Sequence, residues 1–257
     1  MTKTMSCLKE TIQEYLKRDC RITAVPVTGS TNRDVKELAQ KGFPEGTVLI
    51  AEEQTAGRGR LGRSFFSPAG SGLYFSVLLR PTAGDPLRIT AAAGVAVARA
   101  AADCGVELQI KWVNDLYLGN KKVCGILAEG AAKENGLEYC VLGIGLNVFA
   151  PQGGFGDLES VAGALWETAP DGDLRAKLAA GILDHFFALY EDLENPSLLE
   201  EYRRRSYLQG KTVTVLRGNE RFPATVTGIG EDLSLQLKTA DGTVSLSSGE
   251  VQLEDYR

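Results

Sequence analysis

Histidine is nearly absent from this sequence, because its 257 residues include only His185. Leu178, Ile182, Phe186 and Leu189 recur around it at the spacing of a helix face. This pattern predicts a structural histidine on that helix, held by a hydrogen-bond partner. Mechanisms that need a histidine base, such as Ser-His-Asp and Cys-His nucleophilic catalysis, are therefore disfavoured, and so are His/Cys zinc sites.

Long apolar runs are absent as well. No stretch approaches the roughly 20 consecutive apolar residues that a membrane-spanning helix requires. Charges are scattered through residues 1–20, where a secretory signal would have an apolar segment. We therefore expect a cytoplasmic protein without membrane contact. The net charge of −5 also excludes nonspecific nucleic-acid binding through bulk electrostatics.

Cysteines are few, and their spacing is not that of a metal site. The five cysteines are odd in number and far apart. Cys104 and Cys124 lie in apolar stretches, so we expect them to be small core residues. We predict no metal ion held by protein side chains.

Hydrophobic periodicity predicts a larger α/β domain. Ser30 or Thr31 can cap a helix that ends at Gly42, and Gly119–Asn120 marks a turn between two strands. We expect helices at residues 7–18, 31–42, 85–105, 173–194 and 197–206. We expect strands at residues 21–27, 47–53, 72–80, 106–112 and 136–148, and a hairpin of two strands at 115–130 with its turn at 119–120.

The sequence pattern changes at Gly210. Residues 210–253 alternate apolar and polar side chains with a period of two, which predicts a five-stranded small barrel or meander. About 45 residues bury little surface alone, so this unit is expected to pack on the larger domain. The predicted domains are residues 1–208 and 209–257.

A loop rich in arginine and glycine follows the strand at 47–53. Gly57, Gly59 and Gly62 match the glycine pattern of a dinucleotide-binding turn, in which the third glycine opens a helix. Here the next residues are RSFFSPAGSG, which cannot form a useful helix, and no acidic residue follows at the required distance. A solvated surface loop is the plain alternative. Mobile glycines beside forked guanidinium donors instead favour a loop that orders around a phosphate or carboxylate.

A second polar cluster lies at residues 111–122. Lys121 at the strand end is expected to be solvated, whereas Lys122 directly precedes the apolar stretch VCGIL and is expected to be drawn toward the sheet. Asn114 and Asp115 are also ordinary turn formers. By itself, this cluster is only moderate support for an anion site.

Five motifs resemble those of the biotin protein ligases. They are GSTN at 29–32, AEEQTAGRGRLGR at 51–63, KWVNDLYL at 111–118, KKVCGIL at 121–127 and GIGLNV at 143–148. Their order and spacing match over residues 22–150, and the small C-terminal β-domain matches too. The resemblance implies an α/β (α+β) fold, with a class II synthetase-like mixed sheet flanked by helices and an SH3-like barrel.

The resemblance also implies a two-step reaction. Biotin and Mg²⁺-ATP would form biotinyl-5′-AMP, and a lysine of a biotin carboxyl carrier protein would then accept the biotin. The resemblance assigns catalytic roles to Arg60, Lys122, Asp115 and Lys111. Implied biotin contacts are Ser30, Thr31, Asn32, Gln54, Gly57, Arg58, Gly59, Arg60, Phe65 and Lys122. Implied ATP contacts are Arg58, Arg60, Lys111, Asn114, Lys122 and Asn147.

Two positions depart from the family pattern. Val113 stands where the family usually has proline, which predicts a less rigid turn, and Phe65 stands where it usually has tryptophan. Neither departure removes a charged group.

Several other functions stay open at this stage. A lipoate or octanoate ligase shares the fold, although GSTN suits a urea better than an aliphatic tail. A DNA-binding repressor of this family would need a helix-turn-helix domain, and only 21 residues precede the first predicted strand, so no DNA partner is expected. A module that only binds other proteins would leave both basic clusters without a function. A homodimer is compatible with the sequence.

Overall fold

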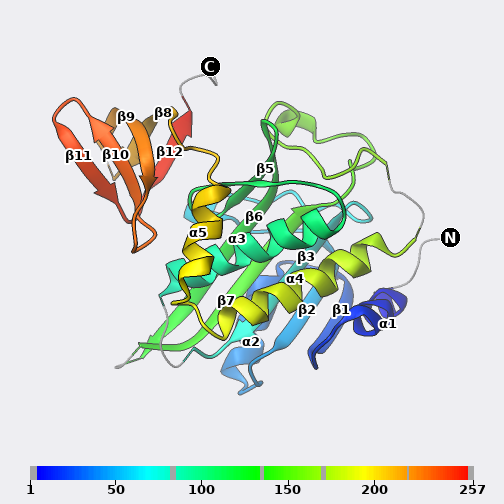
Figure 1. The fold of residues 1–257 in the computed structure, drawn as a ribbon. Coiled ribbons are helices and arrows are strands. Elements are labelled where there is room, and N and C mark those ends of the chain that lie inside the picture. Colours follow the sequence, from blue (N-terminus) through cyan, green and yellow to red (C-terminus); the bar gives the residue numbers. More distant parts are fainter. Residues whose placement is uncertain (1–4, 82–84, 134–135, 169–171, 219, 254–257) are drawn as a thin grey trace.

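The computed structural model describes residues 5–81, 85–133, 136–168, 172–218 and 220–253. It contains a seven-stranded sheet in the order β1-β2-β3-β7-β6-β5-β4 and a five-stranded sheet in the order β11-β10-β9-β8-β12 (Figure 1). In the larger sheet β1 and β2 are parallel and the other neighbours are antiparallel. The expected mixed sheet flanked by helices is confirmed.

The elements follow the predicted order. The strands of the larger sheet are β1 (Arg21–Thr28), β2 (Thr47–Gln54), β3 (Gly72–Leu79), β4 (Gln109–Lys111), β5 (Asp115–Leu118), β6 (Lys121–Lys133) and β7 (Gly136–Asn147). The α-helices are α1 (Met5–Tyr15), α2 (Thr31–Gln40), α3 (Pro86–Asp103), α4 (Leu174–Tyr190) and α5 (Pro196–Arg204). Two 3₁₀ turns are η1 (Arg60–Gly62) and η2 (Gly156–Leu158).

Helices α3 and α4 lie over one face of the larger sheet (Figure 1). Eight of the 18 residues of α3 are alanine, and a Cβ added at Gly181 of α4 would lie 3.3 Å from Ala100 Cβ, so the two helices pack closely. Phe75, Val77 and Leu79 of β3 are buried in the same core. This apolar face supplies most of the burial that stabilises the domain.

The opposite face of the sheet is only partly covered. Val35 and Ala39 of α2 pack with Leu49, Leu78 and Val141 in a small separate core. Beyond this core, the same face carries small or polar residues instead of an apolar layer. This uncovered part positions the candidate site.

The C-terminal sheet packs against the larger domain, as expected. Its strands are β8 (Thr212–Arg217), β9 (Glu220–Ile229), β10 (Leu235–Thr239), β11 (Gly242–Leu246) and β12 (Glu250–Leu253). Trp112 Nε1 donates to Leu233 O at 2.9 Å, and Arg203 Nε donates to Ile229 O at 2.9 Å. Both bonds connect the larger domain to the C-terminal sheet, so directional contacts as well as apolar burial specify their relative position.

Two local predictions need correction. Ser30 occupies the N-cap position of α2 but its side chain makes no capping bond, and the N–H of Thr31 at the helix start donates to Gln54 Oε1 at 2.9 Å. The strand expected at 106–112 shortens to β4, since Val106 N donates to Ala101 O at 2.9 Å and so completes the end of α3 around Gly105.

His185 and Cys124 behave as predicted. His185 Nε2 lies 2.8 Å from Asp103 Oδ2, which supplies the expected structural partner. Cys124 is buried and Cys104 is half-buried, and both are free thiols. Within the described residues, no three metal-ligating side chains are grouped. No helix in that part of the chain is long and apolar enough to cross a membrane.

We predict that Trp112→Phe weakens the contact between the two sheets. The substitution leaves the buried Leu233 carbonyl without its indole donor, so the free energy of unfolding should fall by about 1–3 kcal/mol in urea denaturation. Trp166→Phe is the matched control, since the described residues give its indole nitrogen no hydrogen bond. Equal losses in both variants would contradict the proposed importance of this bond.

Candidate functional site

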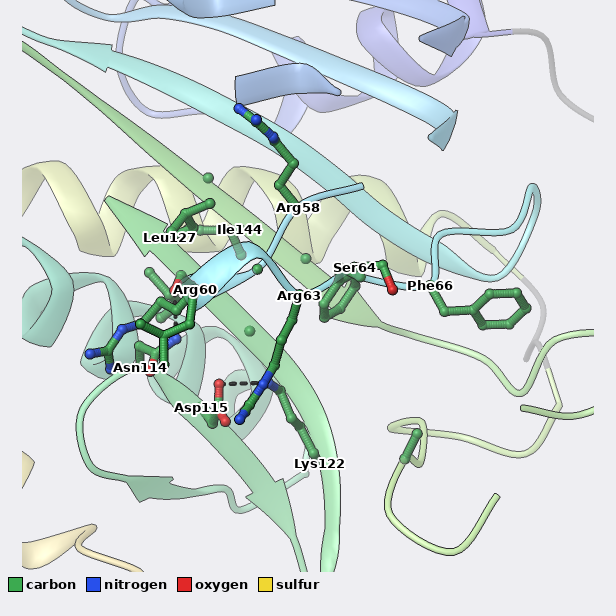
Figure 2. A pocket seen from close by; sticks show the side chains of 18 of the residues that line it. Arg58, Arg60, Arg63, Ser64, Phe66, Asn114, Asp115, Lys122, Leu127 and Ile144 are labelled. Carbon is green, nitrogen blue, oxygen red and sulfur yellow. Dashed lines mark hydrogen bonds and ion pairs between the residues drawn. The ribbon is translucent and has the colours of Figure 1, made fainter. Parts of the chain in front are cut away.

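A cavity of about 390 Å³ lies on the uncovered part of the sheet. That volume is within the range of small-molecule sites. Its walls are the start of α2, the arginine loop (residues 57–66), the turn at residues 111–115 with the start of β6, the loop that contains η2, and the start of β12. Figure 2 shows side chains from several of these walls facing the same space.

Glycines on two neighbouring strands form part of the cavity floor. Along β7, Ile144 and Leu146 are buried in the core, whereas Gly143 and Gly145 line the cavity. Gly145 pairs with Gly125 of β6. The Phe65 ring occupies the space above both, because a Cβ added at Gly145 would lie 2.6 Å from that ring. A glycine inside a strand marks such a close approach.

Polar side chains are linked at the α2 end of the cavity. Gln54 Oε1 lies 3.1 Å from Thr31 Oγ1 and accepts the Thr31 N–H, while Gln54 Nε2 donates to Ser67 Oγ at 3.0 Å. Ser76 Oγ lies 2.7 Å from Thr31 Oγ1 and 2.6 Å from Asn32 Oδ1. These groups form a neutral, buried hydrogen-bond network.

The arginines of the loop point in different directions (Figure 2). Arg60 donates to Asn114 Oδ1 at 3.1 Å and to Gly249 O at 3.4 Å. Arg63 donates to Glu250 Oε2 at 2.5 Å, and Arg58 lies 4.0 Å from Glu129 Oε1 on the other side. The sequence offered few acids near these arginines. The fold supplies them from β6 and β12, so the loop is ordered by partners that are distant in sequence.

A lysine and a carboxylate meet beside the loop. Lys122 Nζ lies 2.7 Å from Asp115 Oδ1, which confirms that Lys122 is drawn toward the sheet (Figure 2). Lys111 lies nearby over the Tyr117 ring, at 5.6 Å from its centroid. Burial lowers the pKa of Lys111 below its ordinary value, although the charge of Asp115 acts in the opposite direction.

The turn that carries Asp115 is held firmly. Asn114 Nδ2 donates to Ile126 O at 2.8 Å, and Ile126 N donates to Asn114 O at 2.9 Å. Val113 is buried, and its carbonyl accepts from Tyr202 Oη at 3.2 Å. Asn114 therefore has the turn-forming role, and the valine that replaces the family's proline is part of a packed turn.

The cavity brings together nearly all the residues that were singled out in the sequence. Gly57 is the exception, because it does not line the cavity. Its carbonyl oxygen accepts from Phe65 N at 2.9 Å within the loop. A Cβ at Gly57 would lie only 2.4 Å from Phe65 O, so this glycine shapes the loop. The cavity lining includes Ser30, Thr31, Asn32, Gln54, Arg58, Gly59, Arg60, Phe65, Lys111, Asn114, Asp115, Lys122 and Asn147.

Sequence reasoning missed several contributors. Gly125, Gly143 and Gly145 were quoted only as motif letters, and Ser76 was not singled out. The signal for the glycines was their occurrence at alternate positions of an otherwise apolar strand, as in GIGLN. Glu250 could not be found locally, because it reaches the cavity from the C-terminal sheet.

The arrangement separates two kinds of chemistry. One end offers a neutral network that can recognise a polar, uncharged group. The other end gathers four cationic side chains near Asp115, and these are Lys111, Lys122, Arg60 and Arg63. Clustered cations in a partly desolvated cavity stabilise negative charge more strongly than they would in water.

We predict a lowered pKa for the Glu250 carboxyl group. Burial alone would raise it, but the hydrogen bond and charge of Arg63, with smaller contributions from Gln252 and Lys111, together outweigh burial. The stabilisation from this pair is therefore present above the ordinary glutamate pKa of about 4.3 and is lost as the pH falls through the lowered value. A carboxyl NMR titration should show a low midpoint that rises in Arg63→Gln. The control Arg221→Gln removes a charge elsewhere in the same sheet, and an equal rise there would contradict the assignment.

Comparisons with known proteins agree with this geometry. The family model "Biotin/lipoate A/B protein ligase family" matches residues 24–147, and "Biotin protein ligase C terminal domain" matches residues 209–253. A Mycobacterium tuberculosis protein named Biotin--[acetyl-CoA-carboxylase] ligase is 35% identical over 244 residues, which cover 90% of this chain and 88% of that protein.

Two further relatives extend the similarity. Bifunctional ligase/repressor BirA of Bacillus subtilis is 31% identical over 240 residues, which cover 88% of this chain and 72% of that protein. The structure of an Aquifex aeolicus biotin protein ligase in complex with biotin and ATP superposes with a TM-score of 0.78 at 29% identity, covering 91% of this chain and 98% of that one. This chain therefore belongs to the biotin/lipoate A/B protein ligase family and, within it, to the biotin protein ligases.

Proposed function

We propose that this protein condenses biotin with ATP to form biotinyl-5′-AMP and then transfers the biotin to a lysine of a biotin carboxyl carrier protein. Family membership supports both steps. The observation that carries the proposal is the cavity itself, in which the Lys122–Asp115 pair and the loop arginines lie at the end opposite a neutral hydrogen-bond network. We further propose residues 1–208 as the catalytic domain and 209–257 as the C-terminal domain.

The neutral network is proposed to bind the ureido ring of biotin. A urea has two N–H donors and one carbonyl acceptor without net charge, which matches the hydroxyl and amide groups of Ser30, Thr31, Asn32 and Gln54. Phe65 lies over the glycine floor and provides apolar surface next to this network. The valeryl chain would then run toward the cationic end.

The cationic end is proposed to bring the two anionic reactants together. A carboxylate oxygen of biotin attacks the α-phosphorus of ATP, an acyl–phosphate bond forms, and pyrophosphate leaves. Lys122, Lys111 and Arg60 would offset the repulsion between carboxylate and triphosphate. Asn147, whose Nδ2 donates to Gly163 O at 2.9 Å, is proposed to lie at the adenine.

Magnesium is proposed to arrive with the triphosphate, as part of the substrate. Mg²⁺ prefers oxygen ligands and is commonly held by one or two carboxylates together with phosphates. In the described residues Asp115 is already paired with Lys122, and no three ligating side chains are grouped. The protein residues thus fit a metal–nucleotide complex better than a metal cage of their own.

Asp115 is proposed to orient the acceptor amine in the second step. The amine attacks the acyl carbon, the amide bond forms, and AMP leaves. A lysine amine with a pKa of about 10.4 is almost entirely protonated at neutral pH. The Asp115 carboxylate attracts that amine and stabilises the positive charge that develops on its nitrogen during attack.

Loss of the cationic groups should abolish adenylate formation. Arg60→Ala and Lys122→Ala are each expected to slow biotin-dependent exchange of labelled pyrophosphate into ATP by at least about 100-fold, because charge stabilisation is lost as the reactants approach. Lys133→Ala is the control, since this lysine lies at the far end of β6. Exchange at the wild-type rate in either cavity variant would contradict the proposal. Calorimetric binding of lipoate in preference to biotin would instead indicate a lipoate ligase.

The two steps should respond differently to Asp115→Asn. We expect transfer of biotin from preformed adenylate to a carrier domain to slow at least about tenfold more than pyrophosphate exchange does, because the amide attracts the amine more weakly. Single-turnover transfer with isolated biotinyl-5′-AMP measures this difference. Equal effects on both steps would mean that Asp115 acts only through Lys122.

A further inference from the structure

Glu129 on β6 touches both sides of the cavity's neutral end, although it was not singled out in the sequence. Its Oε2 accepts from Asn32 Nδ2 at 2.9 Å, and its Oε1 lies 4.0 Å from Arg58 Nη1. The two contacts differ in environment, because Asn32 is buried while the Arg58 side chain is 59% exposed. An exposed ion pair at this distance contributes little, so the bond to the buried amide dominates.

The position of Asn32 is sterically specified. It lies over Gly143, where an added Cβ would approach Asn32 Oδ1 to 2.0 Å. Gly143 pairs with Ser76 of β3 on one side and with Leu127 of β6 on the other. The Asn32 amide therefore lies across three strands, with Ser76 at one end and Glu129 and the Leu127 carbonyl at the other.

The Glu129 carboxylate, together with the Leu127 carbonyl, determines which way this amide faces. A carboxylate only accepts hydrogen bonds, so Asn32 must direct its NH₂ group to Glu129 and its oxygen to Ser76. Ser76 has one hydroxyl proton, and when it goes to that oxygen, the Thr31 hydroxyl can donate to Ser76 at 2.7 Å in preference to the Gln54 oxygen at 3.1 Å. The Gln54 oxygen already accepts the Thr31 N–H and one Gln54 N–H donates to Ser67, so the second N–H of Gln54 and the Ser30 hydroxyl remain for a ligand.

We propose that Glu129 is a positioning residue for biotin. It holds the Asn32 amide and, through that amide, orients the Ser76 and Thr31 hydroxyls next to the proposed position of the ureido ring. Glu129 itself touches no reacting atom. This inference rests on the proposed function, because it assigns the network to biotin.

Three variants separate this role from a purely structural link. Glu129→Ala leaves one N–H of the Asn32 amide without its acceptor and should raise the KM for biotin at least about tenfold while the KM for ATP changes less than about twofold. Glu129→Gln keeps an oxygen that can accept from Asn32, so its KM for biotin should stay within about threefold of wild type. Glu138→Ala, an exposed glutamate on β7, is the control.

A paired substitution tests the direction of the hydrogen bonds. Asn32→Asp places two carboxylates against each other and should raise the KM for biotin at least about 30-fold. Adding Glu129→Gln supplies an amide donor to the carboxylate introduced at position 32 and should restore at least about a threefold part of that loss. Pyrophosphate exchange gives all KM values, and thermal unfolding confirms that each variant is folded.

The outcomes distinguish this inference from the proposed function. An inactive wild-type protein would remove the proposed function. With an active wild type, an unchanged biotin KM in Glu129→Ala, equal increases for biotin and ATP, a Gln variant as impaired as Ala, or no rescue of Asn32→Asp would each overturn the role of Glu129.

Discussion

Along β7 the side chains alternate between two environments that make opposite demands. Leu142, Ile144 and Leu146 are buried under the helices that cover one face, whereas Gly143 and Gly145 leave bare backbone on the other. The glycine side lets the polar network and an aromatic ring approach the strand so closely that a methyl group would collide with either. Helix α2 covers only part of this side, and its first residues bring the network to the edge of the open region. Every wall of the cavity is placed relative to this floor.

The cationic end depends on the contact between the two sheets. Arg60 and Arg63 reach Gly249 and Glu250 at the start of β12, so the C-terminal sheet forms part of the cavity wall. The Trp112 indole, in the turn that carries Asp115, donates a hydrogen bond to Leu233 of the same C-terminal unit. The position of the C-terminal sheet is thereby linked to the loop and to the turn that would hold the reacting groups.

Much of the architecture could be predicted because it depends on local chemistry. Alanine-rich and amphipathic periodicity located the helices, alternation located the C-terminal strands, and the order of five motifs identified the family. Local reasoning failed where a distant group competed for a bond, as at Ser30, where Gln54 satisfies the helix start, and at Val106, which completes α3. Local reasoning also could not identify the partners of the loop arginines.

The sequence by itself determined which chemical groups are present and which segments carry them: a glycine-rich arginine loop, a lysine at the start of an apolar strand, and almost no histidine. Only the tertiary structure decided their partners. Glu129 meets Arg58 and Asn32, and Glu250 meets Arg63 across 187 positions of the chain, through the pairing of strands and the packing of two sheets. Charge and hydrogen bonding act over a few ångströms, so they depend on distance in space, which residue order alone does not specify.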